Sequence, residues 1–381
     1  MNTPSPELIS SSPFAAKKSA RLLSIDTLRG FDMLLIAGGG AFIEKLEGKT
    51  GLAWVDGLAR QFQHPPWNGF TFYDFIFPLF LFIAGLSLPF SLNKGLATGL
   101  SKRNLYRKAL RRLIILILLG IIYKNSPIPF FDPSNIRVVS VLGRIGIAGF
   151  VTTILYLNFS WSKRLMWVAG ILILYYAALF LIPVPGYGAG DLSFEGNLVG
   201  WIDRSFLPGR LLQKTYDELG LLTQLPSLCL CILGSLAGDI LRSDRRDTKK
   251  LQLLIISGVI SIGLGLFWSL HFPINKHLWS SSFILLTGGL AFLCLSLFYF
   301  LIDMMKYKKW TFFFQVIGLN SLTIYLVYRF IDFYYTSKLL FSGLYAPAPE
   351  PWHEVFEAIG AVTLVWLFLY FLYRKKIFVK I

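Results

Sequence analysis

Residues 72–92 read FYDFIFPLFLFIAGLSLPFSL, and this stretch decides the fold. The run is as long as a membrane-crossing helix requires, about 20 residues, and Asp74 is its only charged side chain. Pro78 is tolerated in such a helix where neighbouring helices satisfy the freed backbone groups, and it can open a pocket there. The stretch therefore predicts a transmembrane helix with one ionisable group about a turn from its start.

The composition extends this prediction to the whole chain. Of 381 residues, 55% are hydrophobic and 15% are charged, and the mean hydropathy is +0.59. Soluble domains carry about 25% charged residues, so this composition excludes a soluble enzyme, a disordered chain and a disulfide-rich scaffold. Cys229, Cys231 and Cys294 lie in apolar runs. They are expected to be small hydrophobic side chains, and no metal site is predicted.

Nine further apolar segments have lengths near that of a span, which needs about 17–25 residues. The ten predicted spans cover 22–43, 72–92, 107–123, 138–157, 165–182, 221–241, 251–269, 281–303, 311–330 and 353–373. They predict an all-α fold, a polytopic membrane bundle of about ten transmembrane helices in which residues 22–381 form one domain. Residues 1–21 are rich in Ser and Pro and are expected to be a disordered cytoplasmic tail.

The basic residues indicate how this bundle is oriented. The chain has 37 Lys and Arg against 21 Asp and Glu, a net charge of +16. Ten spans place both termini on one side, and 25 of the 37 basic residues fall on that side. Basic loops mark the cytoplasmic side, so both termini are expected there, and the excess charge does not call for a nucleic-acid partner. The sequon at 158–160 falls on the same side, which favours a bacterial inner membrane over a glycosylating organelle.

The loop that leads into the 72–92 span holds the richest set of chemical groups. His64 exchanges a proton near neutral pH, and Asn68 offers a hydrogen-bond donor and an acceptor. Asp74 is a carboxylate inside the membrane, where a charge is energetically costly, so its presence there indicates a function. A histidine beside a carboxylate is the pattern of a base and its orienting partner. The alternative is an interfacial histidine above a tryptophan belt, with Asp74 paired to a basic residue.

Other predicted spans also contain charged side chains. Asp26 and Arg29 lie three residues apart on one helical face, and Asp32 lies deeper. They form either a helix-start cap with a local ion pair or a charged cluster at the cytoplasmic end of a pocket. A buried Arg144 must find an anion, which is either one of Asp26, Asp32 and Asp74 or a phosphate group of a ligand, since the planar guanidinium binds two oxygens at once.

Two loops carry further candidates. The basic run 102–112, which includes Arg107 and Arg111, is a topology signal that meets anionic lipid headgroups, or it binds a phosphorylated cosubstrate. The outer segment 195–217 combines polar groups with aromatic residues, a combination that suits a sugar. Asp203 and Arg204 are its charged candidates, and the alternative is that they form an ordinary surface pair within a packed loop.

Nine motifs follow one another along residues 22–381. In order they are Ser24-Ile25-Asp26-Thr27-Leu28-Arg29-Gly30, the glycine triplet 38–40, His64-x-x-Trp67-Asn68-Gly69, Asp74-x-x-Phe77-Pro78, Gly200-x-Ile202-Asp203-Arg204, Asp217-x-x-Gly220-Leu221-Leu222, Asn275-Lys276-x-Leu278-Trp279-Ser280, Gly318-x-Asn320-Ser321-Leu322 and Tyr373-Arg374-Lys375-Lys376-Ile377-Phe378. Taken together, these motifs resemble the heparan-alpha-glucosaminide N-acetyltransferase family of membrane acyltransferases.

The resemblance implies that acetyl-CoA on the cytoplasmic side donates an acetyl group to an amino sugar on the far side, and it places the family's active-site histidine on His64. Relatives often have an asparagine before the glycine triplet, and a His-Glu pair in the ninth span. This chain has apolar residues before the triplet and Tyr328-Arg329 in the ninth span.

Two functions follow from these observations. The first is acyl transfer from acetyl-CoA to a glycan, catalysed by His64, Asp74 and Asn68. Its donor site is expected to include Arg29, Arg107, Arg111 and Arg144, and its acceptor site Trp67, Asp203, Arg204 and Asn320. The second is a transporter or flippase for a sugar or lipid-linked glycan. Transporters often show two related halves, and no second copy of the His64 segment occurs, which favours the enzyme. Membrane lipid and, by resemblance, a second copy of the chain are the other expected partners.

Overall fold

The computed structural model describes residues 22–379, so the predicted 1–21 tail lies outside the described residues. Within the described range the chain folds into helices and short turns, with no β-strand. The elements are α1 (Leu23–Leu34), η1 (Leu35–Gly39), α2 (Ala41–Glu44), α3 (Ala53–Arg60), α4 (Phe72–Ala97), α5 (Lys102–Lys124), η2 (Pro133–Asn135), α6 (Val141–Asn158), α7 (Trp161–Leu181), α8 (Leu198–Phe206), α9 (Gln224–Arg242), α10 (Asp247–Ser269), α11 (Ser281–Phe298), η3 (Tyr299–Met304), α12 (Thr311–Gly318), α13 (Ser321–Val327), α14 (Phe333–Tyr345), η4 (Glu350–Trp352) and α15 (His353–Arg374).

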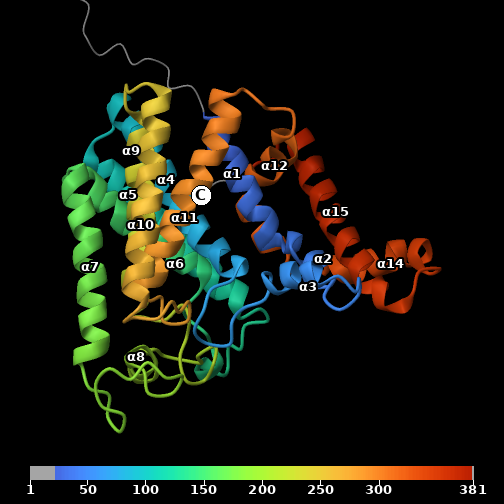
Figure 1. Ribbon diagram of the computed structural model, residues 1–381, viewed down its shortest axis with the longest axis horizontal. Coiled ribbons are helices and arrows are strands. Elements are labelled where there is room, and N and C mark those ends of the chain that lie inside the picture. The colour runs from blue at the N-terminus through green and yellow to red at the C-terminus, as the bar shows by residue number, and fades with distance from the viewer. Residues whose placement is uncertain (1–21, 380–381) are drawn as a thin grey trace, which may run out of the picture.

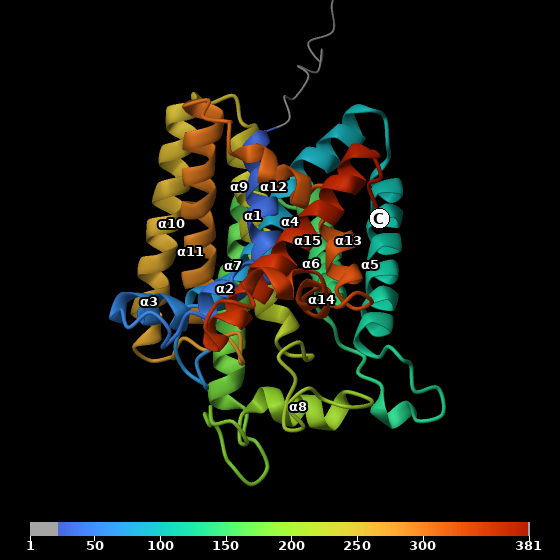
Figure 2. The same ribbon diagram turned by 90° about the vertical axis from the view of Figure 1, so that its right-hand side faces the viewer.

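The long helices stand side by side and connect two ends of the molecule (Figures 1 and 2). The upper end, at the top of Figure 1, holds the start of α1 and the short connection between α9 and α10. The lower end holds α8 and the long loops around it, below the tips of α7 and α10. The ends differ as the sequence predicts, with short connections at one and long aromatic loops at the other.

Seven helices of the described chain are long and apolar enough to cross a membrane: α4, α6, α7, α9, α10, α11 with η3, and α15 with η4. They correspond to seven of the ten predicted spans and make the protein a multi-pass membrane protein. The predicted spans at 22–43, 107–123 and 311–330 are also helical, but they are interrupted or charged.

The first of these three is interrupted at the glycine triplet. Ala37 and Gly38 have non-helical backbone angles, and Gly38 has φ +80°, a conformation that glycine adopts without strain. The break frees backbone carbonyls, and the Tyr328 hydroxyl donates to the Ala37 carbonyl oxygen at 2.5 Å. The triplet therefore produces an unwound turn, and a side chain from the ninth predicted span satisfies it.

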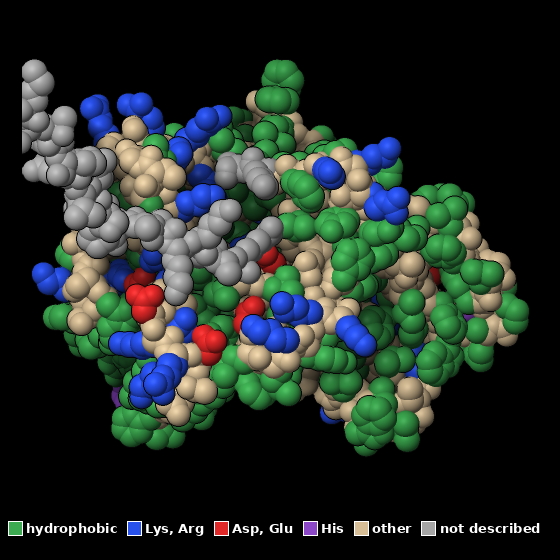
Figure 3. All heavy atoms as spheres, turned by 90° about the horizontal axis from the view of Figure 1, so that it is seen from above, with side chains coloured by type: hydrophobic (Ala, Val, Ile, Leu, Met, Phe, Trp, Pro, Cys, Tyr) green, Lys and Arg blue, Asp and Glu red, His purple; other side chains and the backbone are tan. Residues whose placement is uncertain are grey.

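The other two differ for separate reasons. The span predicted at 311–330 divides into α12 and α13 around Leu319 and Asn320. Helix α5 is continuous over 23 residues, but its first half carries the predicted basic run. These residues place positive charge on the upper part of the molecule, and Lys and Arg side chains are scattered over the upper end seen from above (Figure 3).

The centre of the bundle depends on close helix contacts. A Cβ at Gly85 of α4 would lie 1.9 Å from the Cys231 carbonyl oxygen of α9, and one at Gly30 of α1 would lie 1.8 Å from the Phe314 carbonyl oxygen of α12. Small residues permit such approach between membrane helices. Cys229 and Cys231 are fully buried here and Cys294 is partly buried, so the cysteines pack as the small hydrophobic side chains expected.

Candidate active site

His64 and Asp74 lie together at the lower end of α4. Thr71 caps this helix, and its backbone N–H donates to Asp74 Oδ2 at 3.1 Å, which completes a capping box. The other carboxylate oxygen, Oδ1, is 2.7 Å from Nδ1 of His64. The Asp74 side chain is fully buried, whereas that of His64 is 43% exposed. The base and orienting partner that the sequence suggested are therefore in hydrogen-bond contact.

Lys276, which was not among the predicted site residues, completes this cluster. Its Nζ lies 3.3 Å from Asp74 Oδ1 and 3.1 Å from Nε2 of His64. Lys276 lies in the loop between α10 and α11 and is 212 residues away in sequence from His64. Asp74 thus has both partners that the sequence offered as alternatives, the histidine and a basic residue. The cluster of His64, Asp74 and Lys276 is called the primary cluster below.

Asn68 and Trp67 connect the primary cluster to its surroundings. The Asn275 amide nitrogen donates to Asn68 Oδ1 at 3.0 Å, and the Gly69 N–H donates to the Ile274 carbonyl oxygen at 2.9 Å. The Trp67 ring stacks on the ring of His277, with centroids 5.2 Å apart and planes 10° apart. Two loops that are distant in the sequence therefore lie side by side and form the wall of the site.

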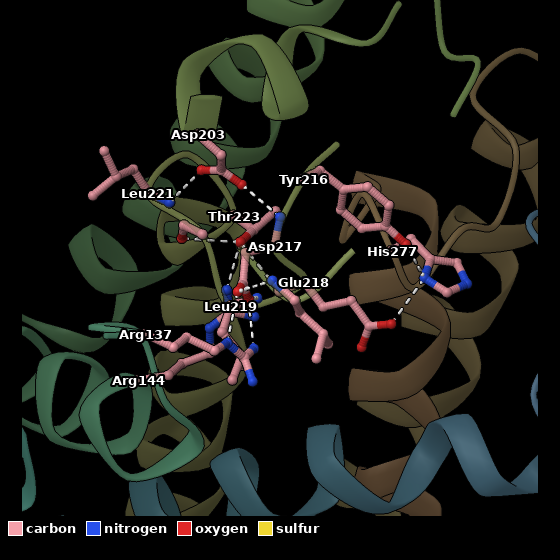
Figure 4. Close-up of polar contacts among 12 residues, drawn as sticks. Arg137, Arg144, Asp203, Tyr216, Asp217, Glu218, Leu219, Leu221, Thr223 and His277 are labelled. Carbon is pink, nitrogen blue, oxygen red and sulfur yellow. Dashed lines mark hydrogen bonds and ion pairs between the residues drawn. The ribbon is translucent and has the colours of Figure 1, made fainter. Parts of the chain in front are cut away.

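A buried ion pair holds the 207–223 loop over the lower end of the bundle (Figure 4). Arg137 Nε and Nη2 donate to the two carboxylate oxygens of Asp217, both at 2.7 Å. These side chains are 4% and 0% exposed. The same carboxylate accepts the backbone N–H groups of Leu212 and Leu219 at 3.0 and 2.9 Å. The sequence contained both charges but gave no signal that they pair.

Asp203 supports the same loop from α8. Its carboxylate accepts the backbone N–H groups of Asp217 and Leu221 at 3.0 and 2.9 Å (Figure 4). Burial raises the pKa of Asp203 to about 6, although the two backbone donors act in the opposite direction. The neighbouring Arg204 donates to the carbonyl oxygens of Thr215 and Glu195.

Asp203 and Arg204 each bind loop backbone, which agrees with the packed loop of the second alternative, although the contacts of the described chain include no ion pair between them. The acceptor-site role of Arg204 stays a prediction. Asp203 is fully buried, so it positions the loop and presents no surface to a sugar.

Arg144 lies beneath this loop. Its Nη2 donates to the Thr223 hydroxyl at 2.5 Å, and its guanidinium lies 4.4 Å from the centroid of the Trp279 ring. The side chain is 1% exposed, and Nε and Nη1 have no hydrogen-bond partner in the described chain. Arg144 does not contact Asp26, Asp32 or Asp74, the partners that the sequence suggested. The acidic residues near it are Asp203, Asp217 and Glu218, from the lower end of the molecule (Figure 4).

Two cavities penetrate the bundle from the upper half. The upper cavity, about 740 Å³, lies between α4, α5 and α6. Its basic lining residues are Lys94, Lys108, Arg111 and Arg112. The central cavity, about 770 Å³, lies between α1, α4, α5, α6 and the α12–α13 segment. Ser91, Arg112 and Ile145 line both cavities, so they adjoin.

The central cavity continues toward the lower end. Phe77 lines it, and this residue is about one helical turn from Asp74. The Phe77 ring also contacts the Trp279 ring edge to face, at 5.5 Å between centroids. The adjoining cavities are therefore lined by basic groups above and by apolar and aromatic groups below, as far as Phe77, and His64, Asp74 and Lys276 are not among their lining residues.

The remaining predicted residues take different places relative to this path. Arg111 lines the upper cavity and Arg29 lines the central cavity, where Arg29 Nη2 donates to the Ser87 hydroxyl at 2.7 Å. Arg29 also forms the expected local ion pair with Asp26, at 3.5 Å. Arg107 lies about one turn from Arg111 on α5. Asn320 is 1% exposed and donates to the Ile377 carbonyl oxygen at 3.1 Å, so this side chain contacts the C-terminal segment.

Sequence reasoning missed Lys276, Arg112, Glu218 and His277 as individual site residues. Signals for some of them were present. Lys276 stands in one of the motifs of the resemblance, and Arg112 belongs to the basic run. Which of these side chains converge could not be read from the sequence, because they come from three separate elements.

These features define a class: a multi-pass helical membrane protein with adjoining cavities lined by basic groups toward one end and a histidine–carboxylate pair at the other end. Comparison with known proteins gives the family. The family described as an acyltransferase domain matches residues 22–370, and the chain belongs to it.

The chain is also similar to two curated proteins. It is 30% identical over 422 aligned residues to the heparan-alpha-glucosaminide N-acetyltransferase of Homo sapiens, with 95% of this chain covered. It is 29% identical over 432 aligned residues to the enzyme of that name from Mus musculus, with 97% covered. The alignments cover 60% and 62% of these relatives, so the chain spans about three fifths of their length.

Proposed function

We propose that this protein is a transmembrane acetyltransferase that moves an acetyl group from cytoplasmic acetyl-CoA to an amino-sugar acceptor on the opposite side of the membrane. The observation that carries the proposal is the pair of adjoining cavities, lined by basic residues at the upper end and also by Phe77, about one helical turn from Asp74. The acyltransferase family and the names of the two relatives support the reaction class.

The lining of the cavities fits acetyl-CoA. Its nucleotide end carries phosphates, which favour Lys108, Arg111 and Arg112 around the upper cavity. The pantetheine arm is slender and largely uncharged, and it suits the apolar central cavity beyond Arg29. Arg107 extends the basic surface of α5. Arg144 lines neither cavity, and we assign it to the support of the 207–223 loop rather than to a phosphate.

The primary cluster supplies the acyl-transfer chemistry. The buried Asp74 carboxylate favours the tautomer of His64 that carries its proton on Nδ1, which leaves Nε2 with a lone pair. That nitrogen either attacks the thioester carbonyl or removes a proton from the acceptor. The Lys276 ammonium group lies at hydrogen-bond distance from Nε2 and is placed to stabilise negative charge on the acetyl oxygen. Asn68, held by Asn275, is a second candidate donor.

The topology in this proposal has ten crossings and both termini in the cytoplasm. Helices α1, α5 and the α12–α13 pair supply the three crossings that the seven long apolar helices do not. The upper end then faces the cytoplasm of a bacterial cell and the lower end faces outward from its inner membrane. Residues 22–381 act as one domain in contact with membrane lipid, and we propose a homodimer as the assembly.

Membranes that contain the protein test the proposal directly. They are given acetyl-CoA labelled in the acetyl group together with glucosamine, and transfer is compared between wild type and His64→Ala. We expect transfer by wild type and a loss of at least about 100-fold in the variant, as for a group that moves a proton or carries the acyl group. His353→Ala is the matched control, because His353 lies on α15 and its ring contacts the Ala348 carbonyl oxygen. A wild-type protein that neither binds acetyl-CoA nor transfers the label refutes the proposal.

A further inference from the structure

A second histidine–carboxylate pair lies beside the primary cluster. Nδ1 of His277 is 3.0 Å from Glu218 Oε1 and 2.7 Å from the Tyr216 hydroxyl (Figure 4). The side chains of His277 and Glu218 are 13% and 25% exposed, so the pair is sheltered but not sealed. Glu218 comes from the 207–223 loop, whereas His277 comes from the loop between α10 and α11. The pair therefore joins two lower loops, and no step assigned above uses it.

The two pairs share one wall. His277 follows Lys276 directly in the chain, and Lys276 contacts both His64 and Asp74. Trp67 lies three residues after His64 and stacks on the His277 ring. Backbone and side-chain hydrogen bonds hold the two segments side by side, as described for Asn68 and Gly69. A substrate group that reaches the primary cluster from the lower side therefore passes close to His277.

The electrostatics of the second pair leave one ring nitrogen available. Burial alone would raise the pKa of Glu218, but the hydrogen bond with His277 and the charge of Lys276 outweigh it and hold this pKa below its usual range. Glu218 is therefore ionised at neutral pH and favours the His277 tautomer with its proton on Nδ1. Nε2 then keeps its lone pair and acts as a hydrogen-bond acceptor and base.

Aromatic rings next to this pair suit a sugar. Phe194 lies 5.4 Å from the Trp67 ring and 5.3 Å from the Tyr216 ring, both edge to face, and Phe194 is 41% exposed. Such rings offer an apolar surface to the carbon face of a pyranose. The ionised Glu218 favours a ligand that carries a positive charge, as a protonated amino sugar does.

We propose that His277, oriented by Glu218, is the acceptor-side base that receives the proton of the acceptor amine. This inference rests on the proposed acetyltransferase function. Transfer from the CoA thioester proceeds in balanced steps. Nε2 of His277 takes one proton from the ammonium form of the acceptor, and the free amine nitrogen then forms a bond to the acetyl carbon. The carbon–sulfur bond breaks and its electron pair leaves with sulfur, the thiolate takes the second amine proton to give the CoA thiol, and His277 releases its proton to solvent.

The same assignment holds when His64 carries the acetyl group. The acylated Nε2 of His64 then has no lone pair, so a second base is needed to take the first proton of the acceptor ammonium group, and His277 takes it. The free amine attacks the acetyl carbon, the bond from that carbon to Nε2 of His64 breaks with its electron pair on the nitrogen, and this nitrogen takes the second amine proton. Both routes balance in atoms and protons.

The test compares two acceptors in membranes supplied with labelled acetyl-CoA. Glucosamine is largely protonated at neutral pH and needs a base, whereas hydroxylamine is largely unprotonated and needs none. We expect His277→Gln to lower kcat/KM for glucosamine by at least about 100-fold, while transfer to hydroxylamine and the KM for acetyl-CoA change little. Glu218→Gln is expected to act in the same direction with a smaller loss. His271→Gln is the matched control, since His271 is exposed on the same loop and contacts the Tyr176 hydroxyl.

The outcomes separate this inference from the proposed function. An unchanged kcat/KM for glucosamine in His277→Gln, when His64→Ala is inactive, overturns the inference and leaves the acetyltransferase standing. An equal loss with both acceptors also overturns it, because His277 then only maintains the structure of the site. A wild-type protein without any transfer from acetyl-CoA removes the function on which the inference rests.

Discussion

Replacement of Arg137 by methionine is expected to loosen the 207–223 loop, because it leaves the Asp217 carboxylate buried without its cation. Both side chains are nearly inaccessible, at 4% and 0% exposed, and they share two hydrogen bonds of 2.7 Å. Removal of one partner of a buried pair costs about 3–5 kcal/mol. At 1.36 kcal/mol for each factor of ten, opening of the loop becomes about 10²- to 10⁴-fold more frequent.

Amide hydrogen exchange on the detergent-solubilised protein measures this opening. Peptides that cover Leu212–Leu221 report on backbone N–H groups that Asp217 and Asp203 hold, and they are expected to lose protection. Peptides of the α10–α11 hairpin serve as the control for global unfolding and are expected to keep theirs. Replacement of Asp217 by asparagine in the Arg137→Met background is expected to restore part of the protection, since it removes the stranded charge. Additive losses in the double variant, or a change below about tenfold in Arg137→Met, would refute the reasoning.

Three other predictions follow from local geometry. The raised pKa of Asp203, about 6 against an unfolded value of about 3.9, means that the folded protein holds this proton more tightly; the contribution is fully present below pH 4 and is lost as pH rises through 6. Protection of the 207–223 loop by hydrogen exchange should therefore fall between pH 5 and 7, and Asp203→Asn should flatten this change; an unaltered slope contradicts the assignment. Gly30→Ala places a Cβ 1.8 Å from a backbone carbonyl oxygen of α12 and is expected to destabilise the protein by about 1–3 kcal/mol or more in thermal unfolding. Gly149→Ala is the control, because no atom lies within 4 Å of the added Cβ, and it is expected to be neutral or stabilising. Arg112→Gln is expected to raise the KM for acetyl-CoA about tenfold, because one charged hydrogen bond is lost, and to leave the KM for the acceptor unchanged. Arg103→Gln on the same helix is the control. Equal effects of the two substitutions would argue against a phosphate site in the cavities.

The transmembrane helices and the pair of His64 and Asp74 were the most predictable features of the molecule. Seven of the ten predicted spans appear as long apolar helices because a run of about 20 apolar residues has few alternatives to a membrane helix. His64 and Asp74 were predictable as partners because a loop and one helical turn separate them.

The partners of isolated charges were much less predictable. Arg144 was expected to meet Asp26, Asp32, Asp74 or a phosphate, yet its contacts are Thr223 and the Trp279 ring. Asp203 was expected to meet a sugar, yet it binds backbone N–H groups of its own neighbouring loop. A charge in a membrane protein needs a partner, but hydropathy gives no information on which helix or loop supplies it.

The sequence by itself determined that this chain is a helical membrane protein, which helix ends carry positive charge, and that His64 has a carboxylate within reach. These properties depend on composition and on residues near one another in the chain. Only the tertiary structure decided that Lys276 joins His64, that His277 and Glu218 form a second pair beside it, and that two cavities adjoin at Arg112. Such convergence depends on how the helices pack and how the lower loops cross one another, and side chains separated by up to about 200 residues meet only once that packing is complete.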